Sequence, residues 1–154
     1  MERKLYTVLD NIRSAENVGS ILRTAESLGI DRVFLVGITP DLSHPKVKKT
    51  SLGAEDNLDI VYEKDSVTLA EKLKKENFET VSLEICEGSM DIEDFVFKKD
   101  ICLFLGNEVS GVAKEILDIS DCIIKIPMAG KKESLNVAVS FGIAAYALKM
   151  KNKV

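Results

Sequence analysis

Three short stretches of the sequence place glycine beside charged, hydroxyl or amide side chains, next to an apolar run. Such a stretch can bind a ligand, because glycine lets a ligand approach the backbone closely and the polar groups then hold it. The three stretches cover residues 10–30, 101–117 and 126–148. Each also has an interpretation that involves no ligand.

The first stretch, "DNIRSAENVGSILRTAESLGI", carries an arginine beside an apolar helical stripe. Arg23 lies off that stripe, and Gly19 one turn earlier predicts free space beside the guanidinium. Asn17 stands at or near the expected helix start, where an amide side chain can cap the helix. The alternative is a surface Arg23 paired with Glu26, together with a capping asparagine.

The second stretch, "ICLFLGNEVSGVAKEIL", ends an apolar strand at Gly106 and continues with the carboxylate of Glu108. It lacks the Gly-Lys-Ser/Thr of a phosphate loop and the three glycines of a dinucleotide fingerprint. The alternative is a polar turn in which Glu108 complements the dipole of the next helix.

The third stretch, "IPMAGKKESLNVAVSFGIAAYAL", ends in a helix that is apolar nearly all round. Ser134 is the expected N-cap of that helix, which puts Asn136 in its first turn among free backbone N–H groups. Capping explains Ser134, but it explains less well why Asn136 follows, because asparagine is a mediocre residue inside a helix. A helix apolar on every side is buried by its own sheet or by a second subunit.

Lysines accompany these stretches, and four of them are candidate RNA contacts. Small cationic clusters are either solvated surface or phosphate contacts. The four are Lys46, Lys48, Lys49 and Lys131.

Strands and helices alternate along the chain, which predicts an α/β fold with a mostly parallel sheet. Ligands bind at the carboxyl ends of such strands, where the three stretches lie. Strands are expected at 4–10, 32–37, 58–63, 80–86, 101–106 and 122–128, and helices at 17–29, 65–78, 110–120 and 134–150, followed by a frayed basic tail.

Composition places the chain among globular proteins. Its 154 residues, 45% of them hydrophobic and 30% charged, predict one domain, residues 1–154. The net charge of −4 argues against a surface that is basic throughout. Three cysteines without a Cys-x-x-Cys spacing indicate buried thiols in a reducing compartment and no metal site. The absence of a signal peptide or long apolar span predicts a cytoplasmic protein.

Taken together, the stretches resemble the three motifs of the SpoU/TrmH-type RNA 2′-O-ribose methyltransferases of the SPOUT superfamily. The resemblance covers nearly the whole chain. The matching residues are Asn17-x-Gly19-x-x-x-Arg23-Thr24-Ala25-x-x-x-Gly29, Leu105-Gly106-Asn107-Glu108-x-x-Gly111 and Ile126-Pro127-Met128-x-Gly130-x-x-x-Ser134-Leu135-Asn136-Val137, with Pro45-Lys46-Val47 and Ser51-x-Gly53-Ala54 between the first two.

The resemblance implies an α/β fold with a C-terminal trefoil knot, which apolar periodicity alone does not predict because connections normally do not thread. It implies a homodimer packed partly through the last helix. It also implies S-adenosylmethionine bound in the knot. The cofactor-binding positions it implies are Gly106, Ile126, Met128 and Leu135, with Leu83 (or its neighbour Glu84) after the fourth strand.

The implied activity is methylation of a ribose 2′-hydroxyl in tRNA or rRNA, with tRNA favoured by the short chain, which has no separate RNA-binding extension. Arg23 is the implied catalytic residue, supported by Asn17, Glu108, Ser134 and Asn136. A guanidinium stays protonated in proteins, so Arg23 is expected to hold a phosphate and stabilise the alkoxide, whereas the family resemblance casts it as a base. The alternatives are a non-catalytic RNA-binding scaffold on the same fold and a methyltransferase that modifies a base or a protein.

Overall fold

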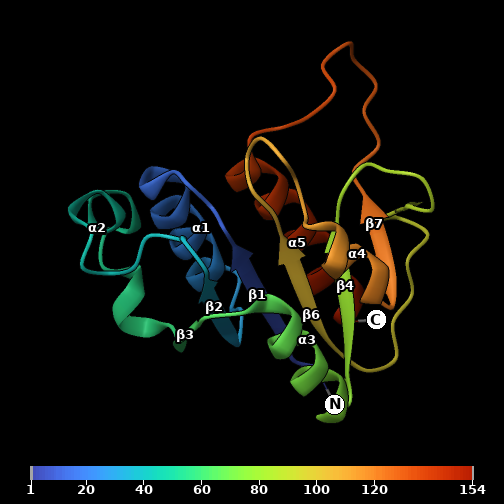
Figure 1. Cartoon of the computed structure of the whole chain (residues 1–154), viewed down its shortest axis with the longest axis horizontal. Helices are drawn as coiled ribbons and strands as arrows, with labels where there is room; N and C mark the ends of the chain where they lie inside the picture. The colour runs from blue at the N-terminus through green and yellow to red at the C-terminus, as the bar shows by residue number, and fades with distance from the viewer. Residues whose placement is uncertain (1, 154) are drawn as a thin grey trace.

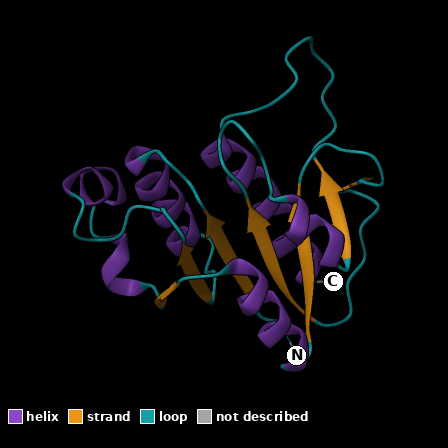
Figure 2. Ribbon diagram, in the orientation of Figure 1, coloured by secondary structure: helices purple, strands orange, loops and turns teal. Residues whose placement is uncertain are grey.

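A single parallel sheet organises the chain in the computed structural model, which describes residues 2–153 (Figures 1 and 2). Its strand order is β3-β2-β1-β6-β4-β7-β5, and every strand pair is parallel. The predicted mostly parallel α/β sheet is therefore confirmed. The strands are β1 Leu5–Asp10, β2 Arg32–Val36, β3 Ile60–Glu63, β4 Phe78–Leu83, β5 Met90–Asp91, β6 Asp100–Leu105 and β7 Cys122–Lys125.

Helices cover both faces of the sheet, which explains why its strands are continuous apolar runs. Alternate residues of β1 enter different cores: Leu5 and Leu9 pack with α1 and α5, whereas Tyr6 and Val8 pack with α3 and α4. The helices are α1 Ala15–Ser27, α2 Pro45–Ser51, α3 Ser66–Lys75, α4 Lys114–Ile119 and α5 Val137–Asn152, with a 3₁₀ turn η1 at Ala54–Asn57.

The strand order reverses direction between β1 and β6. From β1 the chain builds outward through β2 and β3, then crosses to the other half of the sheet, where β4 forms first and β6 later takes the place beside β1. Such a switch point leaves a crevice at the carboxyl ends of the strands, because the loops on its two sides run in opposite directions. The loops that carry the three motif stretches lie at this edge (Figure 1).

Two helices begin at different residues from those expected. Ser14 caps α1 by accepting a hydrogen bond from the Asn17 backbone N–H at 3.2 Å, so Asn17 lies inside the first turn. Asn136, and not Ser134, caps α5 by accepting from the N–H groups of Ala138 and Val139. Both differences have one cause: several polar residues compete for the cap, and only backbone position decides among them.

The expected space beside Gly19 is filled. Residues 45–51, which lie outside the expected helices and strands, form α2, and α2 packs directly against α1. A Cβ on Gly19 would lie 1.8 Å from Thr50 Oγ1 and 2.3 Å from the Val47 carbonyl oxygen. Gly19 therefore permits helix–helix contact, and the prediction that it leaves room for the Arg23 guanidinium is wrong.

The C-terminal tail was expected to be frayed, but it belongs to α5 as far as Asn152. Asn152 accepts a hydrogen bond from the Arg3 N–H at 3.0 Å and donates one to the Arg3 carbonyl at 2.7 Å. Of the cysteines, Cys102 is buried, while Cys86 and Cys122 are half-buried. No helix within residues 2–153 is long and apolar enough to cross a membrane.

Candidate functional site

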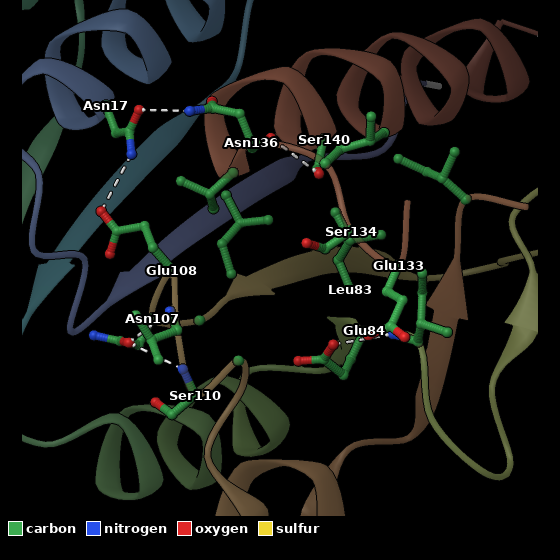
Figure 3. A pocket seen from close by; sticks show the side chains of 18 of the residues that line it. Asn17, Leu83, Glu84, Asn107, Glu108, Ser110, Glu133, Ser134, Asn136 and Ser140 are labelled. Carbon is green, nitrogen blue, oxygen red and sulfur yellow. Dashed lines mark hydrogen bonds between the residues drawn. The ribbon is translucent and has the colours of Figure 1, made fainter. Parts of the chain in front are cut away.

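A cavity of about 780 Å³ lies at the carboxyl ends of β4, β6 and β7, between the starts of α1 and α5 (Figure 3). We call it the motif cavity. All three motif stretches contribute to its wall, although they are far apart in the sequence. Nine of the predicted catalytic and cofactor-binding residues line it: Asn17, Leu83, Gly106, Glu108, Ile126, Met128, Ser134, Leu135 and Asn136.

A chain of side-chain hydrogen bonds crosses the cavity wall (Figure 3). Glu108 accepts from Asn17 Nδ2 at 3.2 Å, and Asn17 Oδ1 accepts from Asn136 Nδ2 at 3.2 Å. Because an amide has one donor end and one acceptor end, these two contacts fix the orientation of the Asn17 side chain. The three motifs therefore each contribute one residue to a single hydrogen-bonded chain.

Glu108 also holds the start of α1. Its two carboxylate oxygens accept from the backbone N–H groups of Arg13 and Ser14, each at 2.8 Å. Partial burial raises the pKa of Glu108, but these donors outweigh that effect and leave the pKa below its ordinary value. The group is therefore a carboxylate at neutral pH. The suggestion that Glu108 complements the helix that follows it is not what the structure shows, because its partners are at α1.

A tight turn of residues 106–112, the glycine loop, forms one side of the motif cavity. Asn107 and Gly111 exchange backbone hydrogen bonds of 2.9 and 3.1 Å. A Cβ on Gly106 would lie 2.2 Å from the Gly111 carbonyl carbon, and Gly111 has a φ of +74°. Both positions therefore require glycine for the loop to close this tightly.

Glu84 fastens the glycine loop to the end of β4. Its Oε2 accepts from the Val112 N–H at 2.8 Å and stands where a Gly111 side chain would be. The sequence placed a candidate at Leu83 or Glu84, and both residues line the cavity. The sequence feature that points to Glu84 is the position of a carboxylate directly after an apolar strand.

Residues 126–135, the cavity loop, contribute to the cavity wall and project from the body of the protein (Figure 1). Within the described part of the chain, no hydrogen bond joins this loop to any other residue. Its backbone N–H and C=O groups are therefore free to bind a ligand. Ile126, Met128, Ser134 and Leu135 line the cavity, whereas the predicted RNA contact Lys131 is exposed and lies outside its wall.

Arg23 does not reach the motif cavity. It is exposed on α1, and no ion pair in residues 2–153 includes it, so the expected alternative pairing with Glu26 is wrong. The arginine that does line the cavity is Arg13, which sequence reasoning missed. The position of Arg13 between a strand end and a helix cap, where ligands are expected, is the sequence feature that could have identified it.

The three predicted lysines of residues 45–51 lie on α2, outside the cavity. All three are exposed, and Lys46 approaches Glu16 at 3.7 Å. Among residues 2–153, no group of three or more His, Cys, Asp or Glu side chains is arranged to hold a metal ion.

Known proteins resemble this chain over nearly its whole length. The sequence model of the SpoU rRNA Methylase family matches residues 4–146. A tRNA (guanosine(18)-2′-O)-methyltransferase of Borreliella burgdorferi is 27% identical over 96% of this chain and 66% of its own length. A 23S rRNA (guanosine(2553)-2′-O)-methyltransferase of Bacillus subtilis is 28% identical over 96% of this chain and 61% of its own length. The chain thus spans about two thirds or less of these relatives.

Solved structures agree with this similarity. The SpoU methyltransferase AviRb from Streptomyces viridochromogenes, in complex with the cofactor AdoMet, superposes with a TM-score of 0.90 at 26% identity, over 99% of this chain and 59% of that one. A protein studied for 2-OH methylation of C/U34 on tRNA matches with a TM-score of 0.86 at 28% identity, over 98% of this chain and 97% of that one.

The match to SpoU structures implies the C-terminal trefoil knot, so the fold that the resemblance predicted is confirmed in full. The family model spans most of the chain, and the three motifs that carried the resemblance converge on one cavity. The chain belongs to the SpoU rRNA methylase family, within the TrmH/SPOUT group.

Proposed function

We propose that this chain is an S-adenosylmethionine-dependent RNA methyltransferase that acts, as a single catalytic domain, on a ribose 2′-hydroxyl. The observation that carries the proposal is the convergence of Asn17, Glu108, Ser134 and Asn136 on one cavity. Family membership and relatives named as 2′-O-methyltransferases of tRNA and rRNA support the reaction type.

The motif cavity fits S-adenosylmethionine. Its volume of about 780 Å³ lies in the range of small-molecule sites. Leu83, Leu105 and Leu135 supply apolar surface, while the unbonded backbone of the cavity loop supplies donors and acceptors for the polar parts of the cofactor. When bound, the cofactor provides an electrophilic methyl group on a sulfonium.

The protein side of the reaction must position a ribose hydroxyl and assist loss of its proton. The Glu108–Asn17–Asn136 chain presents a fixed array of polar groups at the mouth of the cavity. Ser134 lines the same cavity and is exposed, so its hydroxyl can reach the cofactor and the ribose. Arg23 is assigned to hold the adjacent phosphate and stabilise the developing alkoxide, because its guanidinium remains charged.

Homodimerisation would bring Arg23 to a cavity. Helix α5 exposes Val139, Ile143, Tyr146 and Met150, which follow one another at intervals of four, three and four residues and so form one apolar stripe. The neighbouring helix α1 carries Arg23, and Thr24 beside it lies next to Gly142 of α5. A partner docked on this stripe would present its own motif cavity to Arg23, which accounts for an arginine outside the cavity wall of its own chain.

RNA is the proposed substrate, and tRNA is favoured over rRNA. The exposed Lys46, Lys48 and Lys49 on α2 and Lys131 on the cavity loop are assigned to phosphate contacts. The protein studied for tRNA methylation matches this chain over 97% of its own length, which supports the preference for tRNA. The cytoplasmic location expected from the sequence remains a prediction.

The test combines cofactor binding with methyl mapping. Purified protein should bind S-adenosylmethionine in calorimetry and transfer a labelled methyl group to a 2′-hydroxyl of total RNA, as read by mass spectrometry. R23A should abolish transfer and leave cofactor affinity within about twofold, whereas K98A, an exposed cation at the opposite end of β6, should change neither.

Other outcomes would select the other functions. Near-normal turnover by R23A on a competent RNA would refute the role of Arg23. A protein that binds RNA but no cofactor would be the non-catalytic scaffold. A methyl group mapped to a base or to a protein would identify the third alternative.

A further inference from the structure

A second cavity, of about 310 Å³, lies beside the motif cavity at the carboxyl ends of β1 and β2. Asn107, Ser110 and Gly111 line both cavities, so the glycine loop is the wall between them. The remaining wall of the second cavity comes from Asp10, Asn11, Ile38 and Ala113. None of these four belongs to the catalytic or cofactor-binding set assigned above.

Asp10 is the unusual member of this wall. The residue is only 6% exposed, and the side-chain donor beside its carboxylate is the hydroxyl of Ser66, which does not line the cavity. A carboxylate has about four acceptor positions, so capacity remains for further donors. The side-chain oxygens of Asp10 are not among the fully enclosed, unpartnered side-chain atoms of residues 2–153. Burial raises the pKa of Asp10, the nearby Ser66 hydroxyl opposes that shift, and Asp65 adds to it.

The composition of the wall selects the kind of occupant. The wall includes no lysine or arginine, so a phosphate would meet a carboxylate and no compensating charge. An ionised carboxylate only accepts hydrogen bonds, which requires an occupant with N–H or O–H donors. Ile38, which is 66% exposed, and Ala113 add apolar surface against which a flat ring can pack.

A nucleobase of single-stranded RNA has this combination of an apolar face and a donor edge. Guanine carries two adjacent N–H donors on its Watson–Crick edge, which match the two oxygens of one carboxylate. Cytosine and adenine offer one amino group there, and uracil offers one ring N–H between two oxygens that a carboxylate repels. The geometry therefore favours guanine among the four bases.

We propose that the second cavity binds a guanine base of the RNA substrate, with Asp10 accepting from the ring N–H and the amino group. This assignment rests on the proposed function, because the two cavities share the glycine loop and one strand of RNA would span both. The bound guanine positions the neighbouring ribose at the motif cavity, so Asp10 acts as a specificity-determining residue and not as a catalytic one.

The test uses methyl NMR of the intact chain with S-adenosylhomocysteine present, which keeps nucleotides out of the motif cavity. Titration with guanosine 5′-monophosphate should shift the Ile38 and Ala113 methyl signals, and uridine 5′-monophosphate should bind at least about tenfold more weakly. D10N removes a desolvated charge, so the variant should fold, and it should weaken guanosine binding at least about tenfold. E63Q, at the carboxyl end of β3 in the same sheet and outside the cavity wall, is the matched control.

Three outcomes would overturn the proposal: no shift with guanosine 5′-monophosphate, equal response to both nucleotides, or unchanged guanosine binding by D10N. A shift of the same signals with Mg²⁺ alone that D10N abolishes would identify a cation site instead. Failure of the proposed function is a separate result. In that case the protein binds no S-adenosylhomocysteine, whereas guanosine selectivity and its loss in D10N persist.

Discussion

Asn136 Nδ2 donates a hydrogen bond to Asn17 Oδ1 at 3.2 Å, which joins the cap of α5 to the first turn of α1 across 119 residues of sequence. The same Asn136 accepts from the N–H groups of Ala138 and Val139 through its Oδ1. One side chain therefore caps a helix with its oxygen and completes the site with its nitrogen. Helix capping and a role in the site, which the sequence presented as alternatives, are both carried out by the one amide group of Asn136.

Substitutions at Asn136 should separate these two roles. N136D keeps the capping oxygen but loses the donor and adds a negative charge near Glu108, so its melting temperature should stay close to that of the wild type while methyl transfer falls at least tenfold. N136A loses the cap as well and should cost about 1 kcal/mol of stability. Thermal melts and turnover on the same preparations measure both. Normal turnover by N136D would show that the hydrogen bond to Asn17 is dispensable.

Replacement of Glu108 should change stability in a pH-dependent way. The folded pKa of Glu108 lies below its ordinary 4.5, so its contribution is present above pH 4.5 and is lost as the pH falls through the folded pKa. E108Q should therefore melt below the wild type at pH 7, and the difference should shrink below pH 4.5. E93Q, which changes an exposed carboxylate elsewhere, is the control. A gap that stays constant with pH would contradict the role of the charge at α1.

Glycines of the glycine loop and of the cavity loop should differ sharply in their tolerance of a methyl group. G106A places a Cβ 2.2 Å from the Gly111 backbone, so the glycine loop must shift, which should cost about 1–3 kcal/mol and abolish cofactor binding. G130A has no atom within 4 Å of the added Cβ and should leave stability and cofactor binding nearly unchanged. Calorimetric titration and thermal melts compare the two. Equal cofactor affinity in both variants would mean that the glycine loop does not shape the cofactor site.

A charge on the apolar stripe of α5 should prevent the proposed dimer. Ile143 is 43% exposed at the centre of the stripe, so I143K should yield a folded monomer with little methyl transfer. V96K introduces the same charge at a residue that is 77% exposed elsewhere, and it should leave the dimer intact. Light scattering after size-exclusion chromatography gives the mass of each. A wild-type protein that is monomeric at all concentrations would remove the dimer from the mechanism.

Much of this architecture can be predicted from local patterns in the sequence. Apolar runs such as 101–106 predicted the strands, because a parallel sheet covered on both faces needs continuous apolar residues. The motif residues were predicted to lie together because strand ends converge at one edge, and Asn17, Glu108 and Asn136 do so. These predictions required only periodicity, spacing and the resemblance.

Other features depend on contacts that the sequence does not encode locally. Gly19 suggested free space until α2 occupied it, and α2 itself is too short for its periodicity to be visible. The caps of α1 and α5 shifted by two or three residues because neighbouring polar residues compete for the same role. Asp10 looked like an ordinary strand end, and only the neighbouring loops show that it lines a cavity.

The cavity loop implies an energetic cost for cofactor binding. A segment whose backbone is not bonded to the rest of the chain opens with little free energy, so its amides should exchange with solvent within seconds while those of β6 remain protected. Binding a ligand there must order these residues, and the measured affinity is what remains after that loss of entropy. Hydrogen exchange that slows at 126–135 on cofactor addition would report this ordering directly.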